Sequence, residues 1–86
     1  MTKLTYKELE TKLANARLHV VPGSKWRHYK GGEYIIQDIA VSEEDNELAV
    51  MYAPIGRPEI IFVRPLSVWD DQVEWQGLTS HRFTKL

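Results

Sequence analysis

The sequence predicts a mainly β, α+β fold, in which a short N-terminal helix precedes a small β-barrel of five or six antiparallel strands. Two observations support this prediction. Near the N-terminus, apolar residues recur at helical spacing behind a capping motif. The rest of the chain consists of short runs rich in Val, Ile, Tyr, Phe and Trp. Turn signals separate these runs roughly every 8–12 residues, which is typical of a small barrel or sandwich.

The helix is predicted from its first turn. Thr5 and Glu8 have the spacing of a capping box, in which each side chain accepts a hydrogen bond from the other residue's backbone amide. Leu4 and Leu9 occupy the two positions of a hydrophobic staple. One apolar stripe follows at helical spacing, namely Tyr6, Leu9, Leu13 and Ala16. We therefore expect a helix over about residues 6–16, which lies along the barrel or pairs two chains as a homodimer.

The β-rich body begins after Pro22-Gly23, a turn signal that ends the helical arm. Strands are expected at residues 25–30, 33–41, 47–53 and 59–64, with two shorter ones at 72–76 and 80–86. Gly31-Gly32 suits a tight hairpin turn, because glycine tolerates positive φ. Residues 66–71 are expected to form a single 3₁₀ or α turn.

Length and composition restrict the classes of protein to consider. The 86 residues suit one domain, with a helical arm over 1–19 and the barrel over 23–86. The net charge of −1 argues against a strong non-specific binder of nucleic acid. The absence of cysteine excludes disulfides, a thiolate zinc site and a cysteine nucleophile. No signal-length or membrane-spanning apolar run occurs, so we expect a cytoplasmic protein without metal, cofactor or membrane contact.

One run mixes aromatic and basic residues, from Trp26 to Lys30. On a strand, Trp26, His28 and Lys30 share one face, whereas Arg27 and Tyr29 share the other. Such a run suits stacking of a base and binding of a phosphate. It equally suits a strand with core aromatics on one face and a solvated basic edge on the other, and the near-zero net charge favours this second interpretation.

A second candidate block combines Arg64 with Trp69. The guanidinium of Arg64 is suited to a bidentate grip on a carboxylate or phosphate, with Trp69 as a stacking wall. The structural alternative is that Arg64 pairs with Asp70, Asp71 or Glu43 while Trp69 closes one end of the barrel.

These blocks carry a family resemblance. His28-Tyr29-Lys30-Gly31 and Val63-Arg64-Pro65-Leu66, in this order and spacing, resemble a small bacterial and phage family known as domain of unknown function 1653. The similarity covers about residues 23–86 and leaves the helix outside. It implies a small SH3-like β-barrel and no established activity.

Three functions follow from the sequence. The first is a non-catalytic module that binds a protein or peptide in a groove. The alternative is a binder of single-stranded nucleic acid or a nucleotide-like anion. The weakest is a small enzyme using His28, for which no catalytic partner can be identified in the sequence. The candidate binding residues are Trp26, Arg27, His28, Tyr29, Lys30, Tyr34, Arg64, Trp69 and Arg82.

Overall fold

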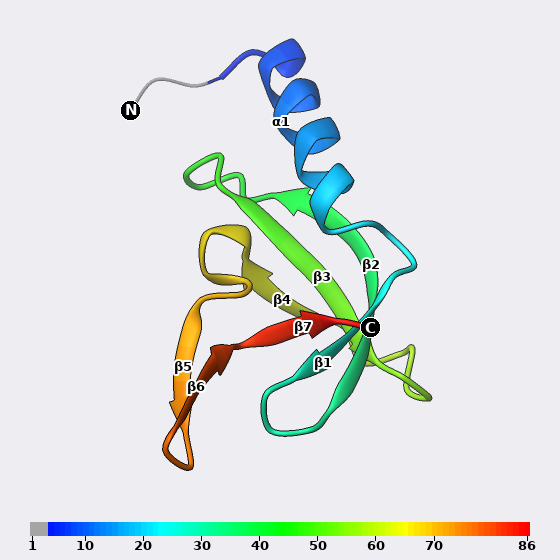
Figure 1. Cartoon of the computed structure of the whole chain (residues 1–86). Helices are drawn as coiled ribbons and strands as arrows, with labels where there is room; N and C mark the ends of the chain where they lie inside the picture. Colours follow the sequence, from blue (N-terminus) through cyan, green and yellow to red (C-terminus); the bar gives the residue numbers. More distant parts are fainter. Residues whose placement is uncertain (1–3) are drawn as a thin grey trace.

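A computed structural model describes residues 4–86, which form one helix, seven strands and one 3₁₀ turn (Figure 1). The first three residues of the predicted arm lie outside the described part. The elements are α1 (Tyr6–His19), β1 (Lys25–His28), β2 (Glu33–Val41), β3 (Leu48–Pro54), β4 (Phe62–Pro65), the 3₁₀ turn (Leu66–Val68), β5 (Gln72–Trp75), β6 (Leu78–His81) and β7 (Phe83–Lys85).

The predicted capping box at the start of α1 is confirmed. The Glu8 amide donates to Thr5 Oγ1 over 3.1 Å, and the Thr5 amide donates to Glu8 Oε1 over 3.0 Å. The helix ends at His19, three residues later than predicted, and the Val20 amide donates to the Ala16 carbonyl as the C-cap. Pro22 restricts only the residue before it, so it does not stop the helix at Ala16.

Only the C-terminal part of α1 reaches the core, as Figure 1 shows. Ala16 is buried, whereas Tyr6 at the other end of the predicted apolar stripe is 86% exposed. Tyr6 therefore does not lie along the sheet, because the first turns of the helix extend past it. The alternative that the stripe pairs two chains stays a prediction. Arg17 ties the helix to β2 through a 3.0 Å ion pair with Asp38. No helix within residues 4–86 is long and apolar enough to cross a membrane.

The strands confirm the predicted fold class. Five of them form one curved antiparallel sheet in the order β4-β3-β2-β1-β7, and β5 pairs with β6 in a separate hairpin. The expected last strand over 80–86 is divided between these two sheets. Arg82 separates its halves, since its amide donates to the Asp71 carbonyl and its carbonyl accepts from the Tyr29 amide. The β5–β6 hairpin extends away from the sheet in Figure 1.

The core lies on the inner face of the curved sheet. Residues paired across antiparallel strands share a face, and the register pairs Tyr52 with both Ile36 and Phe62. Trp69 follows the 3₁₀ turn and stacks on Phe83, with ring centroids 4.0 Å apart and planes 4° from parallel. The buried apolar residues are Ala16, Val20, Trp26, Ile36, Ile39, Leu48, Val50, Ala53, Trp69 and Phe83. The α1 end of the inner face is thus filled, and aromatic side chains cover the opposite end.

Candidate binding face

A continuous row of aromatic rings crosses that second end of the inner face. We call it the aromatic belt, and its members are Trp75, Tyr29, His28, Tyr34, Tyr52 and Phe62. It begins on the β5–β6 hairpin, where the Trp75 and Tyr29 rings meet at 5.7 Å. The next step, from Tyr29 to His28, is 4.4 Å.

Phe83 joins the two halves of the belt from below. The His28 ring lies 5.0 Å from it and the Tyr34 ring 6.0 Å from it. From Tyr34 the row continues to Tyr52 at 5.3 Å and then to Phe62 at 5.7 Å, on the edge strand β4. The rings are therefore connected from the hairpin to the opposite edge of the sheet.

The belt is only partly covered. Phe62 and Trp75 at its ends are 44% and 42% exposed, whereas Phe83 beneath its centre is 3% exposed. Tyr29 and Tyr34 lie between these limits. Aromatic surface that is fixed in place and half in contact with water is well suited to binding, because little side-chain freedom remains to be lost.

The turn from β1 to β2 holds the belt's second and third rings in place. The His28 amide donates to the Gly32 carbonyl over 2.7 Å, and the Gly31 amide donates back to His28 over 2.8 Å. His28 Nδ1 accepts the Lys30 amide over 3.2 Å, which leaves the proton of the neutral ring on Nε2. Gly31 adopts a φ of +104°, a backbone conformation that is strongly disfavoured for residues other than glycine.

We expect Gly31→Ala to destabilise the protein by about 1–3 kcal/mol through backbone strain alone. An added Cβ meets no atom within 4 Å, so steric contact is not the cause. The midpoint of thermal unfolding, followed by circular dichroism, should fall by several degrees. Lys30→Ala, in the same turn, is the control and should leave it nearly unchanged. An unchanged midpoint for Gly31→Ala would contradict the strain argument.

The two arginines beside the belt share one carboxylate. Arg82 Nε lies 2.8 Å from Asp71 Oδ1, and Arg64 Nη2 lies 3.4 Å from the same oxygen. Hydrogen bonding from Arg82, with a smaller effect of Arg64, lowers the pKa of Asp71. The hydrogen bond to Asp71 in turn raises the pKa of Arg82. Arg64 Nε also donates to the Val68 carbonyl over 2.9 Å, so both guanidinium groups are largely engaged within the protein.

Positive charge also lies over the belt's hairpin end. The Lys30 ammonium is 5.7 Å from the Tyr29 ring centroid and 5.5 Å from that of Trp75. The pKa of His28 is lowered, first by burial and then by the charges of Arg82, Lys30 and Arg64. His28 is therefore neutral at pH 7, and its ring belongs with the apolar part of the belt.

The structure brings six of the nine sequence-predicted site residues together: His28, Tyr29, Lys30, Tyr34, Arg64 and Arg82. The other three do not contribute to the exposed surface of the belt. Trp26 is buried and donates its indole N–H to Ser24 Oγ over 2.9 Å. Trp69 is also buried, and Arg27 is exposed and pairs with Glu33 at 3.0 Å. The pairing of Arg64 with Asp71 and the position of Trp69 match the structural alternative drawn from the sequence.

One predicted face is wrong. Strand alternation assigned Tyr29 to the side of Arg27, but its ring lies beside His28. The strand ends at His28, before the predicted Lys30, so alternation no longer applies to Tyr29. Tyr52, Phe62 and Trp75 are not among the candidate binding residues predicted from the sequence. The register that aligns Ile36, Tyr52 and Phe62 depends on a bulge after Ile36, which the sequence does not show.

These features define a small β-rich domain with an aromatic face. No group of three or more His, Cys, Asp or Glu side chains suited to hold a metal ion occurs within residues 4–86. The chain belongs to the family described as protein of unknown function DUF1653, which matches residues 24–85 and leaves α1 outside.

A solved structure of the same family supports this assignment. The crystal structure of a DUF1653 protein from Bordetella bronchiseptica superposes with a TM-score of 0.64 at 28% identity, covering 74% of this chain and 85% of that one. The comparison with curated proteins gave no match. The two sequence blocks on which the family resemblance rests supply His28, Tyr29 and Arg64, so both lie at the aromatic belt.

Proposed function

We propose that this protein is a non-catalytic binding module that holds an extended peptide segment of a partner protein along the aromatic belt. The observation that carries the proposal is the partly exposed row of rings from Trp75 to Phe62, whose two halves are connected by the buried Phe83. Aromatic side chains dominate the binding energy of peptide and protein interfaces, because each buries a large area at low entropic cost. The belt runs from the β5–β6 hairpin to the edge strand β4, and this elongated shape suits a chain segment better than a compact ligand.

The charges near the belt support a peptide over a nucleic acid. Binding of single strands depends on free cations that follow the phosphates and on exposed faces for stacking. Here Asp71 engages Arg64 and Arg82, and Glu33 engages Arg27. The indoles of Trp26 and Trp69, expected from the sequence as stacking walls, are buried.

The chemistry of His28 supports a role without catalysis. Its Nδ1 accepts the Lys30 amide, and its ring packs at 5.0 Å against Phe83. A general base needs a free nitrogen and a pKa near the working pH, whereas burial and neighbouring cations lower this one. We retain a cytoplasmic location as part of the proposal.

The test is an NMR titration of the ¹⁵N-labelled protein with a pool of short peptides and, separately, with a short oligothymidylate. Peptides should shift the signals of Tyr29, Tyr34, Phe62 and Trp75 and leave those of the outer sheet face in place. For a peptide that binds, Phe62→Ala should weaken affinity by about tenfold or more.

Val63→Ala is the matched control. Val63 is the next residue on the same edge strand, and it points to the opposite face. It is also exposed, at 65%, so its truncation should leave peptide affinity unchanged. Equal losses for the two variants would refute the belt as the site. Salt-sensitive shifts with the oligonucleotide alone would favour the nucleic-acid alternative.

A further inference from the structure

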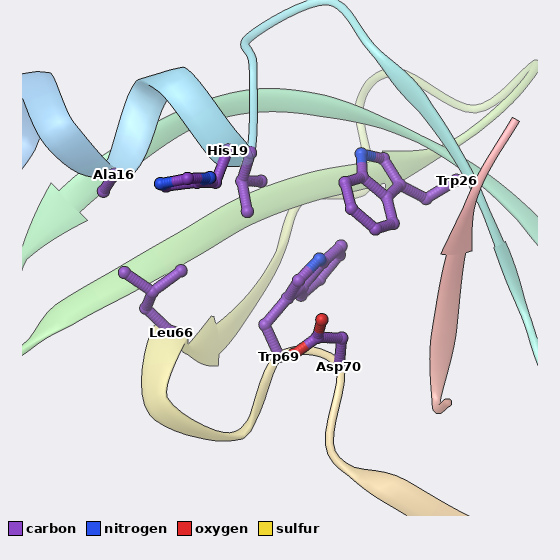
Figure 2. Close-up of a pocket in the computed structure, with 7 residues that line it drawn as sticks. Ala16, His19, Trp26, Leu66, Trp69 and Asp70 are labelled. Atoms are coloured by element: carbon purple, nitrogen blue, oxygen red, sulfur yellow. The ribbon is translucent and has the colours of Figure 1, made fainter. Parts of the chain in front are cut away.

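A cavity lies away from the belt, where the end of α1 meets the sheet (Figure 2). Its volume is about 240 Å³. Its lining residues are Ala16, His19, Val20, Trp26, Leu66, Trp69 and Asp70. Five of these are apolar. Three of the seven, Ala16 and His19 of α1 and the C-cap residue Val20, lie outside the part of the chain that matches the family.

The buried indole of Trp69 has a donor without an acceptor beside this cavity. Trp69 is 2% exposed, and its Nε1 finds no hydrogen-bond partner within residues 4–86. In Figure 2 the nitrogen lies on the edge of the ring that faces the gap below His19. The other indole lining the cavity, that of Trp26, donates to Ser24 Oγ. An unpaired buried donor is costly, and native proteins rarely leave one unsatisfied.

The charges at the rim of the cavity disfavour an anionic ligand. The Asp70 carboxylate lies on one side and the C-terminal end of α1, with its partial negative charge, on the other. Both repel an anion. Apart from the His19 imidazole, the remaining walls are apolar and favour a hydrocarbon group.

We propose that this cavity binds a small neutral molecule with an apolar ring and one carbonyl oxygen, which accepts the Trp69 N–H. Cyclic amides and cyclic ketones have this chemistry. The apolar ring fills the space between the helix end and Leu66, and the carbonyl resolves the unpaired donor. This site is distinct from the proposed peptide site, since none of the residues that line it belongs to the aromatic belt.

The experiment follows the indole N–H signals of the ¹⁵N-labelled protein during titration with ε-caprolactam, a neutral cyclic amide. The Trp69 signal should move downfield and saturate, while that of exposed Trp75 stays in place. Cyclohexanecarboxylate, of similar shape but anionic, should have no effect. Trp69→Phe, which keeps an aromatic ring and removes the donor, should weaken caprolactam binding by about tenfold.

Because Trp69→Phe also changes the packing of the core, Ala16→Leu provides a second test. Ala16 lines the cavity from α1, so the larger side chain should fill it and abolish the caprolactam shift in a folded protein. Binding that is unchanged in either folded variant would overturn the proposal. The proposal would also be overturned if the Trp69 indole signal received magnetisation from water and did not shift with caprolactam. Water would then be the acceptor for the Trp69 N–H.

Discussion

Replacing Trp69 with alanine is expected to destabilise the protein by about 3–5 kcal/mol, the cost of removing a buried aromatic side chain and leaving a cavity. Trp69 stacks on Phe83 at 4.0 Å and meets the edges or faces of Tyr52 at 5.0 Å and Trp26 at 5.7 Å. It is the largest fully buried side chain among residues 4–86. A small domain has a total stability of about 5–15 kcal/mol, so this one substitution removes a large fraction of it.

Urea denaturation followed by far-ultraviolet circular dichroism measures the loss. Trp75→Ala is the matched control, because it removes the same side chain from a position that is 42% exposed. It should cost no more than about 1 kcal/mol. Similar losses for both variants would mean that Trp69 does not hold the sheet end together. The two variants also separate stability from the proposed peptide binding, since only Trp75 belongs to the belt.

The sequence predicted the elements of the fold well because their signals are local. The capping box at Thr5 and Glu8 and the strand over 33–41 appear in the structure as expected. The pairing of Arg64 with Asp71 and the buried position of Trp69 were among the predicted alternatives. Short sequence separation explains the success with Arg64, because a strand followed by one turn brings positions 64 and 71 close together.

The aromatic belt could not be predicted in full, because it depends on long-range register. Phe62 and Trp75 join the belt only through the pairing of β3 with β4 and the position of the β5–β6 hairpin. Local sequence patterns do not indicate either arrangement. Tyr29 was assigned to the wrong face because β1 ends two residues earlier than predicted, and the alternation of side-chain directions stops where the strand ends. Tyr6 shows the same limit of local patterns for the helix. It has the helical spacing of the apolar stripe, but it is exposed because the sheet does not extend that far along α1.

Asp71→Asn is expected to turn the belt's flank into a site for anions. The substitution removes the carboxylate that Arg64 and Arg82 share, so two guanidinium groups become available for phosphates. Affinity for a short oligothymidylate should rise by about tenfold at low salt. The plot of log affinity against log salt concentration should steepen by roughly 1.4, the value for two additional contacts to a single strand. Fluorescence anisotropy of a labelled oligonucleotide measures both.

Asp70→Asn is the control, since it changes the net charge equally at the neighbouring position without freeing either arginine. If both variants gain the same affinity, overall charge rather than Asp71 determines anion binding.

The pH dependence of stability gives an independent check. The pKa of Asp71 is lower in the folded protein than its unfolded value of about 3.9, so its contribution to stability is present above that value. That contribution is lost as the pH falls through the lowered pKa. The stability difference between the wild type and Asp71→Asn should therefore be constant at neutral pH and shrink below about pH 4.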